Sequence, residues 1–267
     1  MTPVQINHRR ADLLVQLLAD QYQHDPFFTT VRANLIENQV LRGVQAGSAA
    51  HAQFLFFAAA NDHGLKSDAM YRKAMQLYAD HPVYFDPVTI MQLTAAQVHT
   101  RIVQPLGARY PNALVRSWME NAASLQATYA GQAINLFQST DDAAELLRRL
   151  KRMRGYGPKI SGMVVRACYS LNFNPRLTNL QAVLVPVDVH DARILFKTGV
   201  FTVPGATEAD FIKYVVPAQR ELLAACNRNH LDWTIVDKAL WLTGSQQRVP
   251  ELVAALQCQL DEVVMRP

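Results

Sequence analysis

Apolar residues recur at intervals of three and four along most of this 267-residue chain, the spacing that places them on one face of an α-helix. The pattern predicts helices over residues 11–22, 31–41, 49–60, 68–79, 95–103, 112–129, 143–153, 159–171, 208–226, 234–242 and 249–264. Residues typical of helix N-caps stand at the start of several of them: Ser67, Thr94, Asp142, Thr207 and Asp232. Only the short β-branched pieces 184–189 and 199–203 look extended. The pattern therefore predicts an all-α fold.

The division into domains is predicted from one loop-rich stretch, residues 172–186, where the chain can cross between two lobes. We expect residues 47–171 to form one helical lobe, and residues 1–46 with 172–267 to form the second. No apolar run approaches the roughly 18 residues that span a bilayer, and the N-terminus lacks the features of a secretory signal. The sequence thus predicts a soluble, intracellular protein with no membrane partner.

Composition and charge narrow the classes of partner. With 50% hydrophobic and 18% charged residues, the chain can bury an ordinary globular core. A net charge of +4 and a pI near 9.0 are only mildly basic, so an anionic partner must be held by a local patch. Cys168, Cys226 and Cys258 lie far apart, which argues against a disulfide framework, a zinc site or an iron–sulfur cluster and predicts core thiols.

A local basic patch is encoded between Leu146 and Val187, where eight Lys and Arg residues occur without a carboxylate. The turn MRGYGPK lies inside this segment. Its glycines, Gly155 and Gly157, give the backbone the freedom and close approach that a connection between two packed helices demands, and Pro158 stands where a new helix can start. The segment therefore predicts a helix, a tight turn and a second helix.

The start of the second helix is a candidate phosphate-binding element. The backbone amides of Gly157, Lys159 and Ile160 would lie at the positive end of the helix dipole and would bind a phosphate oxygen. Lys151 and Arg154 would add charge to such a contact, which ignores nucleotide sequence. The alternative is a plain helix–turn–helix corner with a solvated basic face. The balance of eight cations to no carboxylate favours phosphate binding.

The motifs GYGPK and, after a helix and a crossover, PVDVH resemble those of the helix-hairpin-helix base-excision DNA glycosylases, the superfamily that includes endonuclease III and the 8-oxoguanine glycosylases. The resemblance covers roughly residues 54–245 and is most specific over 147–190. It implies two helical lobes with a cleft between them and the helix-hairpin-helix at its mouth. It also implies a monomer that binds double-stranded DNA containing a damaged base, in the cytoplasm with the nucleoid of a bacterium or archaeon, or in the nucleus of a eukaryote.

The resemblance assigns catalytic roles to Lys159 and Asp188, and the chemistry supports both. Breaking an N-glycosidic bond creates oxocarbenium character on the sugar, which an ionised carboxylate such as Asp188 would stabilise. A neutral lysine amine can displace the base and leave a Schiff base, after which β-elimination cuts the strand. Lys159 would be that nucleophile. The competing interpretations are that Lys159 is one more phosphate-binding lysine and that Asp188 caps a helix beginning near Val189.

Further features follow from the resemblance alone. Asn61 and His63, in the loop of residues 58–64, would fill the gap left by the extruded base. Backbone carbonyls of Lys151, Met153 and Tyr156 would hold a monovalent cation, K⁺ or Na⁺, and no other cofactor is expected. The stretch between Lys159 and Asp188 is longer than in most of the family and closer to the archaeal 8-oxoguanine branch, so we expect an oxidised purine as the substrate. The absence of a four-cysteine cluster argues against the endonuclease III subfamily.

Three other functional classes stay open. The chain could be a helix-hairpin-helix protein that binds DNA without cutting it. It could be an N-glycosidase acting on a small nucleoside or nucleotide. It could also be a metal-dependent phosphohydrolase, since His190 and Asp191 form a pair typical of such sites, but His51, His63 and His81 do not complete a recognisable ligand pattern.

Overall fold

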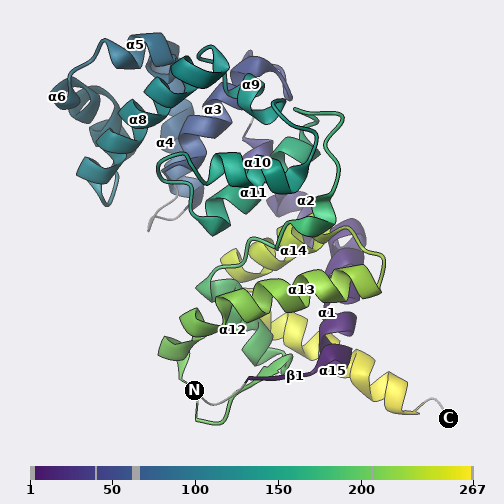
Figure 1. The fold of residues 1–267 in the computed structure, drawn as a ribbon. Helices are drawn as coiled ribbons and strands as arrows, with labels where there is room; N and C mark the ends of the chain where they lie inside the picture. Colours follow the sequence, from purple (N-terminus) through teal and green to yellow (C-terminus); the bar gives the residue numbers. More distant parts are fainter. Residues whose placement is uncertain (1–3, 40, 62–66, 206, 266–267) are drawn as a thin grey trace. The chain divides into compact units, whose positions relative to one another are not determined.

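A computed structural model describes residues 4–39, 41–61, 67–205 and 207–265, and its secondary structure is helical apart from two short strands (Figure 1). The predicted all-α class is confirmed. Backbone contacts divide the chain into two compact units. We call Ala33–Val183 the central unit, and Met1–Arg32 together with Leu184–Pro267 the terminal unit.

The boundaries between the units lie at 32/33 and 183/184, whereas the sequence predicted them at 46/47 and 171/172. Residues 33–46 and 172–183 belong to the central unit because their polar side chains are anchored there. Glu37 forms a buried ion pair of 2.9 Å with Arg166. The Asn174 side-chain amide donates to the carbonyls of Phe137 and Thr140. Both anchors involve buried polar groups that would lose their partners if these segments moved to the other unit.

The terminal unit consists of helices packed around α1, with a two-stranded antiparallel ladder. Its elements are β1 (Gln5–Ile6), α1 (His8–His24), α2 (Pro26–Val31), α12 (Val189–Lys197), β2 (Phe201–Thr202), the 3-10 helix η6 (Glu208–Tyr214), α13 (Val215–Arg228), α14 (Trp233–Ser245) and α15 (Val249–Met265). α1 buries Ala11, Leu14 and Leu18 and packs against α13 and α14. The extended piece predicted at 199–203 contains β2, whereas 184–189 forms no strand and ends where α12 begins.

The central unit holds the remaining elements. They are the 3-10 helices η1 (Arg32–Asn34) and η2 (Ile36–Asn38), α3 (Ala49–Ala59), α4 (Ser67–Asp80), the 3-10 helix η3 (Pro82–Phe85), α5 (Pro87–Met91), α6 (Ala95–Val98), the π-helix η4 (His99–Val103), α7 (Gln104–Leu106), α8 (Pro111–Tyr129), α9 (Ala133–Phe137), α10 (Ala143–Leu150), α11 (Pro158–Ser170) and the 3-10 helix η5 (Leu180–Ala182). α3 is apolar on every side, as expected of a helix enclosed by others, and Phe54, Phe56 and Phe57 are fully buried.

Most predicted helices are present, and the differences have local causes. Thr94, Asp142 and Asp232 cap their helices as expected, each accepting a hydrogen bond from a backbone N–H of the first turn. The helix predicted at 31–41 is instead two short 3-10 turns. The helix predicted at 143–153 ends at Leu150, because the next residues form the turn that leads to α11.

The cysteine prediction is confirmed for Cys168 and Cys226, which are buried, and wrong for Cys258, which is exposed. Burial raises the pKa of the Cys168 thiol well above its ordinary value and that of Cys226 to about 12. Within the described ranges, no helix combines the length and the apolar character that crossing a bilayer requires.

Candidate functional site

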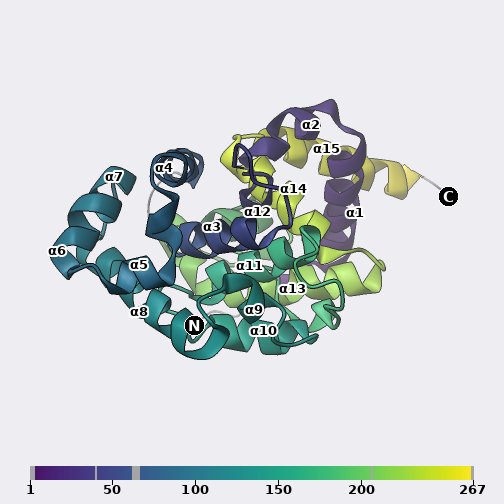
Figure 2. The ribbon, with the colours of Figure 1, turned by 90° about the horizontal axis from the view of Figure 1, so that it is seen from above.

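The candidate site is built around residues 151–157, which we call the glycine turn and which connect α10 to α11. Figure 1 and Figure 2 both show α10 and α11 beside each other, in agreement with their backbone contacts. Gly155 has φ +83°, in the left-handed region, and a Cβ there would lie 3.1 Å from both the Ala60 carbonyl oxygen and Ser117 Oγ. The turn thus passes so close to α3 and α8 that position 155 requires glycine.

Side chains of α8 hold the glycine turn in place. Asn121 Nδ2 donates to the carbonyl of Arg154 at 2.9 Å, and Asn121 Oδ1 accepts from the N–H of the same residue at 2.8 Å. Ser117 Oγ donates to the same carbonyl at 2.9 Å. Both backbone groups of Arg154 are therefore fixed by a helix that the sequence motif does not include. No sequence signal marked Asn121 or Ser117, because both look like ordinary polar residues within a helix.

Tyr156 anchors the other side of the turn. Its hydroxyl donates to the carbonyl of Phe56 at 2.6 Å, and its ring stacks on that of Phe56 with centroids 5.3 Å apart. Burial raises the pKa of the Tyr156 hydroxyl well above its ordinary value, so the group acts as a neutral donor.

Two of the three backbone carbonyls predicted to hold a monovalent cation accept hydrogen bonds within the protein. The carbonyl of Met153 accepts from the Tyr156 N–H at 3.2 Å, and that of Tyr156 accepts from Ser161 Oγ at 3.2 Å. A carbonyl oxygen has two lone pairs, so these bonds leave each of the two able to accept one further contact. Lys151, the third predicted ligand, forms the C-cap of α10. Neutral backbone oxygens are suited to a monovalent cation, and the binding of one at this turn stays a prediction.

The start of α11 has the features expected of an anion site. Gly157 is the N-cap, in extended backbone conformation with φ −72°, and Pro158 occupies the first helical position. A Cβ on Gly157 would meet nothing within 4 Å. Neither backbone conformation nor packing within the protein therefore requires glycine here, in contrast to Gly155. Lys159 is half-buried, and Ile160 is buried with 2% of its surface exposed.

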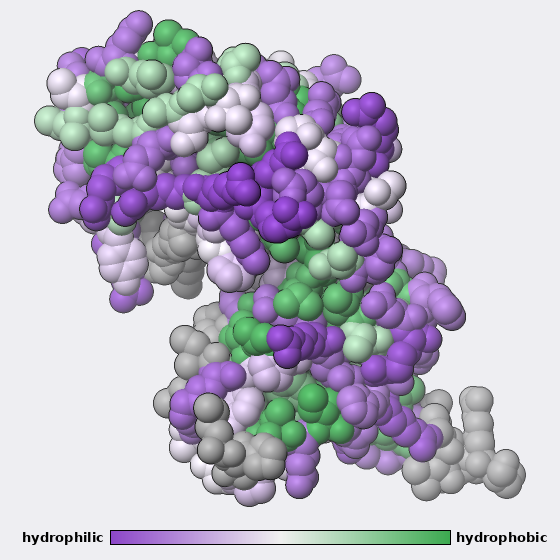
Figure 3. Space-filling model, in the orientation of Figure 1, coloured by the Kyte–Doolittle hydropathy of each residue, from purple (hydrophilic) through white to green (hydrophobic). Residues whose placement is uncertain are grey.

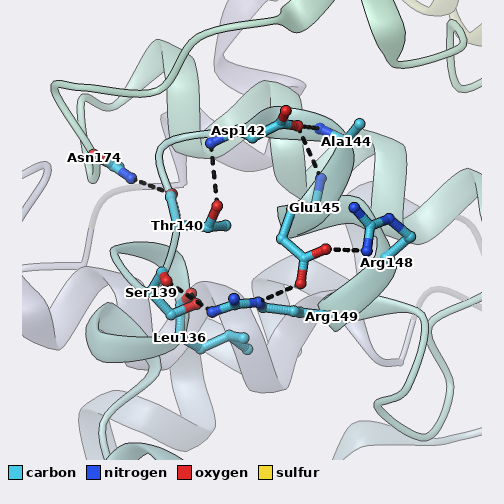
Figure 4. A network of polar contacts seen from close by, with 9 residues as sticks. All are labelled: Leu136, Ser139, Thr140, Asp142, Ala144, Glu145, Arg148, Arg149 and Asn174. Carbon is cyan, nitrogen blue, oxygen red and sulfur yellow. Dashed lines mark hydrogen bonds and ion pairs between the residues drawn. The ribbon is translucent and has the colours of Figure 1, made fainter.

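The basic segment is less positive than its sequence suggests, because carboxylates from outside it pair with several of its cations. Arg148 and Arg149 both form ion pairs with Glu145, and Arg149 also donates to the carbonyl of Ser139 at 2.7 Å (Figure 4). The hydrogen bond from Arg149, followed by the charge of Arg148, lowers the pKa of Glu145. Asp142 caps the same helix and has a lowered pKa, chiefly because it accepts from the Glu145 N–H.

Some of the other cations of the segment are also paired with carboxylates, and some are not. Arg166 belongs to the core, where it pairs with Glu37, and Arg176 pairs with Asp141 at 3.3 Å. Arg154 is exposed and lies 3.4 Å from Glu120. Lys151 and Arg152 are exposed and form no ion pair with any carboxylate in the described part of the chain. Figure 3 shows strongly hydrophilic side chains over α10, which leads into the glycine turn. Within the basic segment, the exposed cations Lys151 and Arg152, which lack a carboxylate partner in the described part of the chain, thus lie in the glycine turn.

Asp188 lies in the terminal unit, whereas Lys159 lies in the central unit. Asp188 Oδ1 accepts from the Asp191 N–H at 3.1 Å, and Asp191 Oδ2 accepts from the Asp188 N–H at 3.0 Å. These reciprocal bonds cap the start of α12 and confirm the helix-cap interpretation of Asp188. A carboxylate can accept about four hydrogen bonds, so capping is compatible with a second role.

Of the two predicted wedge residues, the structure describes Asn61. Asn61 is 6% exposed; its Nδ2 donates to the carbonyl of Phe57 at 3.1 Å, and its Oδ1 accepts from Trp118 Nε1 at 3.1 Å. The Asn61 amide is therefore held inside the central unit, and its role as a wedge stays a prediction. His63 lies outside the described residues, and so does the side chain of His190. The described residues contain no cluster of three or more His, Cys, Asp or Glu side chains suited to a metal.

A cavity of about 220 Å³ adjoins the glycine turn within the central unit. Arg154 and Gly155 form one wall, Ala113 and Leu114 of α8 line the apolar side, and Tyr110 stands at the rim with 56% of its surface exposed. Arg109 lies over the Tyr110 ring, 5.4 Å from its centroid. Exposed aromatic rings and arginines are groups on which nucleobases can stack. This cavity was not predictable from the sequence, since Arg109 and Tyr110 precede α8 without a recognisable motif.

Comparison with known proteins finds no family model and no curated protein that matches this chain.

Proposed function

We propose that this protein is a DNA repair glycosylase with associated lyase activity, which binds duplex DNA through the glycine turn and removes a damaged base. The observation that carries the proposal is the environment of Gly157. Nothing inside the protein requires glycine there, yet a side chain would project at the start of α11, where a phosphate would meet the helix amides. The exposed cations Lys151, Arg152 and Arg154 flank this position.

The catalytic part of the proposal rests on the family resemblance of the two motifs. The Lys159 amine attacks the anomeric carbon, the bond to the base breaks, and the departing base takes up a proton. The lone pair of the bound nitrogen then expels O4′, which takes up a proton as the C1′–O4′ bond opens, and a Schiff base remains. The Schiff base acidifies the C2′ proton, and loss of this proton expels the 3′ phosphate by β-elimination. Asp188 stabilises the positive charge that develops on the sugar before the new bond is complete. An oxidised purine such as 8-oxoguanine is the proposed substrate.

Borohydride trapping on a panel of duplexes, each with one lesion, tests mechanism and substrate together. The intact protein is expected to form a covalent adduct with the oxidised-purine duplex, and Lys159→Gln is expected to abolish it. Lys151→Gln is the matched control, because it removes an exposed lysine from the same turn: affinity falls, while trapping at saturating DNA persists. Full trapping in Lys159→Gln would remove that residue from its proposed role.

A second candidate function is favoured by the capping bonds of Asp188, which give that carboxylate a structural reason to be present. The protein would then bind DNA without cutting it. Asp188→Asn separates the two, because asparagine still caps a helix but does not stabilise a cation. Slower base release at unchanged affinity supports the glycosylase, whereas an intact protein that binds duplexes and releases no base from any lesion supports the binding module. Free nucleosides in the same panel test for an N-glycosidase of small substrates.

A further inference from the structure

A second, larger pocket of the central unit lies where α4, η3 and the π-helix η4 meet, and has a volume of about 390 Å³. Figure 2 shows α4 beside α7, which follows η4 directly, in agreement with their backbone contacts. None of the residues that line this pocket belongs to the glycine turn or to the cavity beside it. Its lining is rich in hydrogen-bond donors, including Lys73, His81, Tyr84 and Arg101.

The charges of this pocket are not balanced. Lys73 on α4 and Arg101 on η4 are both exposed, and neither forms an ion pair with a carboxylate among the residues described. The acid in the lining, Asp80, accepts two hydrogen bonds of 2.9 Å from the Gln76 side-chain amide instead. The two cations therefore share one concave surface with a single carboxylate, that of Asp80, which forms no ion pair with either of them, so the lining keeps a net positive charge. Such a pocket is suited to an anionic ligand.

The backbone explains how the two cations come to share the pocket. In η4, Ile102 and Val103 are both buried, which fixes the rotation of this turn and places Arg101 on the opposite, pocket-lining side. A π turn is rare and often occurs at functional sites, because it changes the direction in which its side chains project. Lys73 Nζ lies against Gly107, where an added Cβ would be 2.5 Å away. The positive φ of +66° favours glycine at position 107, and the Lys73 ammonium group occupies the space beside it.

We propose that this pocket binds a phosphate group. The guanidinium fork of Arg101 and the ammonium of Lys73 match a tetrahedral oxyanion, and the His81 ring and the Tyr84 hydroxyl supply further donors. The phosphate is either a phosphodiester of a bound DNA strand or a free phosphate ester. The site is independent of the proposed glycosylase activity, because it shares no residue with the glycine turn, with Lys159 or with Asp188.

Inorganic phosphate is the probe that tests the site, added to the ¹⁵N-labelled full chain at an ionic strength held constant with chloride. Saturable shifts are expected in the backbone signals of Thr100 and Arg101. Arg101→Gln and Lys73→Gln should each weaken phosphate about ten-fold, the loss expected for one charge-assisted hydrogen bond, and Lys73→Arg should retain binding. Arg9→Gln, an exposed arginine of the terminal unit, is the matched control and should change nothing.

The proposal is overturned if phosphate produces no saturable shift, or if the Lys73→Gln, Arg101→Gln double variant binds it as tightly as the intact protein. Both positions are exposed, so the variants are expected to fold, which the thermal unfolding midpoint checks. Two further ligands identify the source of the phosphate. The salt dependence of duplex binding is the slope of the logarithm of the binding constant against the logarithm of the salt concentration. If the double variant lowers the magnitude of this slope by about two, the source is the DNA backbone. If a deoxynucleoside monophosphate binds more tightly than inorganic phosphate while duplex affinity is unaffected by the double variant, the source is a free ester.

Discussion

Asn121 binds both backbone groups of Arg154, donating to its carbonyl at 2.9 Å and accepting from its N–H at 2.8 Å. Arg154 lies outside any helix, so its N–H and carbonyl have no partner within a helix. The side-chain amide of Asn121 bonds to both groups instead. Asn121 is 1% exposed, which shields both bonds from water. This contact fixes the glycine turn on α8 and thereby determines where Arg154 and its neighbours present their charges.

We expect Asn121→Ala to lower the free energy of unfolding by about 1–3 kcal/mol, because it leaves the buried N–H of Arg154 without a partner and leaves the carbonyl of that residue with Ser117 Oγ alone. Guanidinium unfolding of the full chain measures the change. Asn112→Ala, in the exposed first turn of the same helix, is the control and should change the free energy by less than about 0.5 kcal/mol. Equal stability of the two variants would mean that Asn121 does not constrain the turn.

The two glycines of the turn are expected to respond in opposite ways. Gly155→Ala forces a side chain into the left-handed region and against Ala60 and Ser117, and should destabilise the protein by about 1–3 kcal/mol. Gly157→Asp meets no neighbour and supplies an N-cap for α11, so it should stabilise the protein by about 0.5–1 kcal/mol.

Duplex binding distinguishes a structural role for Gly157 from a functional one. Its replacement by aspartate puts a negative charge where the proposed phosphate lies, so affinity should fall at least ten-fold although the fold is stabilised. Thermal unfolding and a binding titration on the same sample measure the two effects. A Gly157→Asp protein that binds DNA as tightly as the intact chain would show that the start of α11 is not the phosphate site.

The helices were predictable because local spacing of apolar residues and capping side chains determine them. Thr94 and Asp142 mark helix starts that the structure confirms. The segment of residues 31–41 was misjudged because its apolar residues, which include Leu35 and Ile36, are buried from two short 3-10 turns rather than from one helix face. Periodicity reports which residues are buried, and does not by itself distinguish these conformations.

The candidate site was only partly predictable, because its electrostatics depend on contacts between distant parts of the sequence. Arg166 counted toward the basic segment, yet it is a core residue paired with Glu37, 129 positions away. Asn61 looked like a loop residue, yet Trp118 holds it inside the unit. A count of charges along the chain cannot include such partners. Gly155 and Gly157, by contrast, were recognisable in the sequence. The structure shows that close packing requires glycine at position 155 but not at position 157.

His51 makes the stability of the central unit depend on pH. It is fully buried on α3, its Nδ1 accepts from the Gly47 N–H at 3.2 Å, and its ring meets that of Phe173 edge-on. Its Nε2 has no hydrogen-bond partner among the described residues. Burial therefore lowers the pKa of His51 below the ordinary value of 6.5, because the charged ring would be taken out of water.

The direction of the pH effect follows from that shift. Above pH 6.5 the ring is neutral in both states, and the folded protein has its full stability. As the pH falls below 6.5, the unfolded chain takes up a proton that the folded chain resists, so the free energy of unfolding decreases by up to about 1.4 kcal/mol per pH unit. Urea unfolding at pH 7.5 and 5.5 measures this loss, which His51→Gln should reduce and His81→Gln, at an exposed histidine, should preserve. If His51→Gln retains the whole loss, other groups are responsible for it.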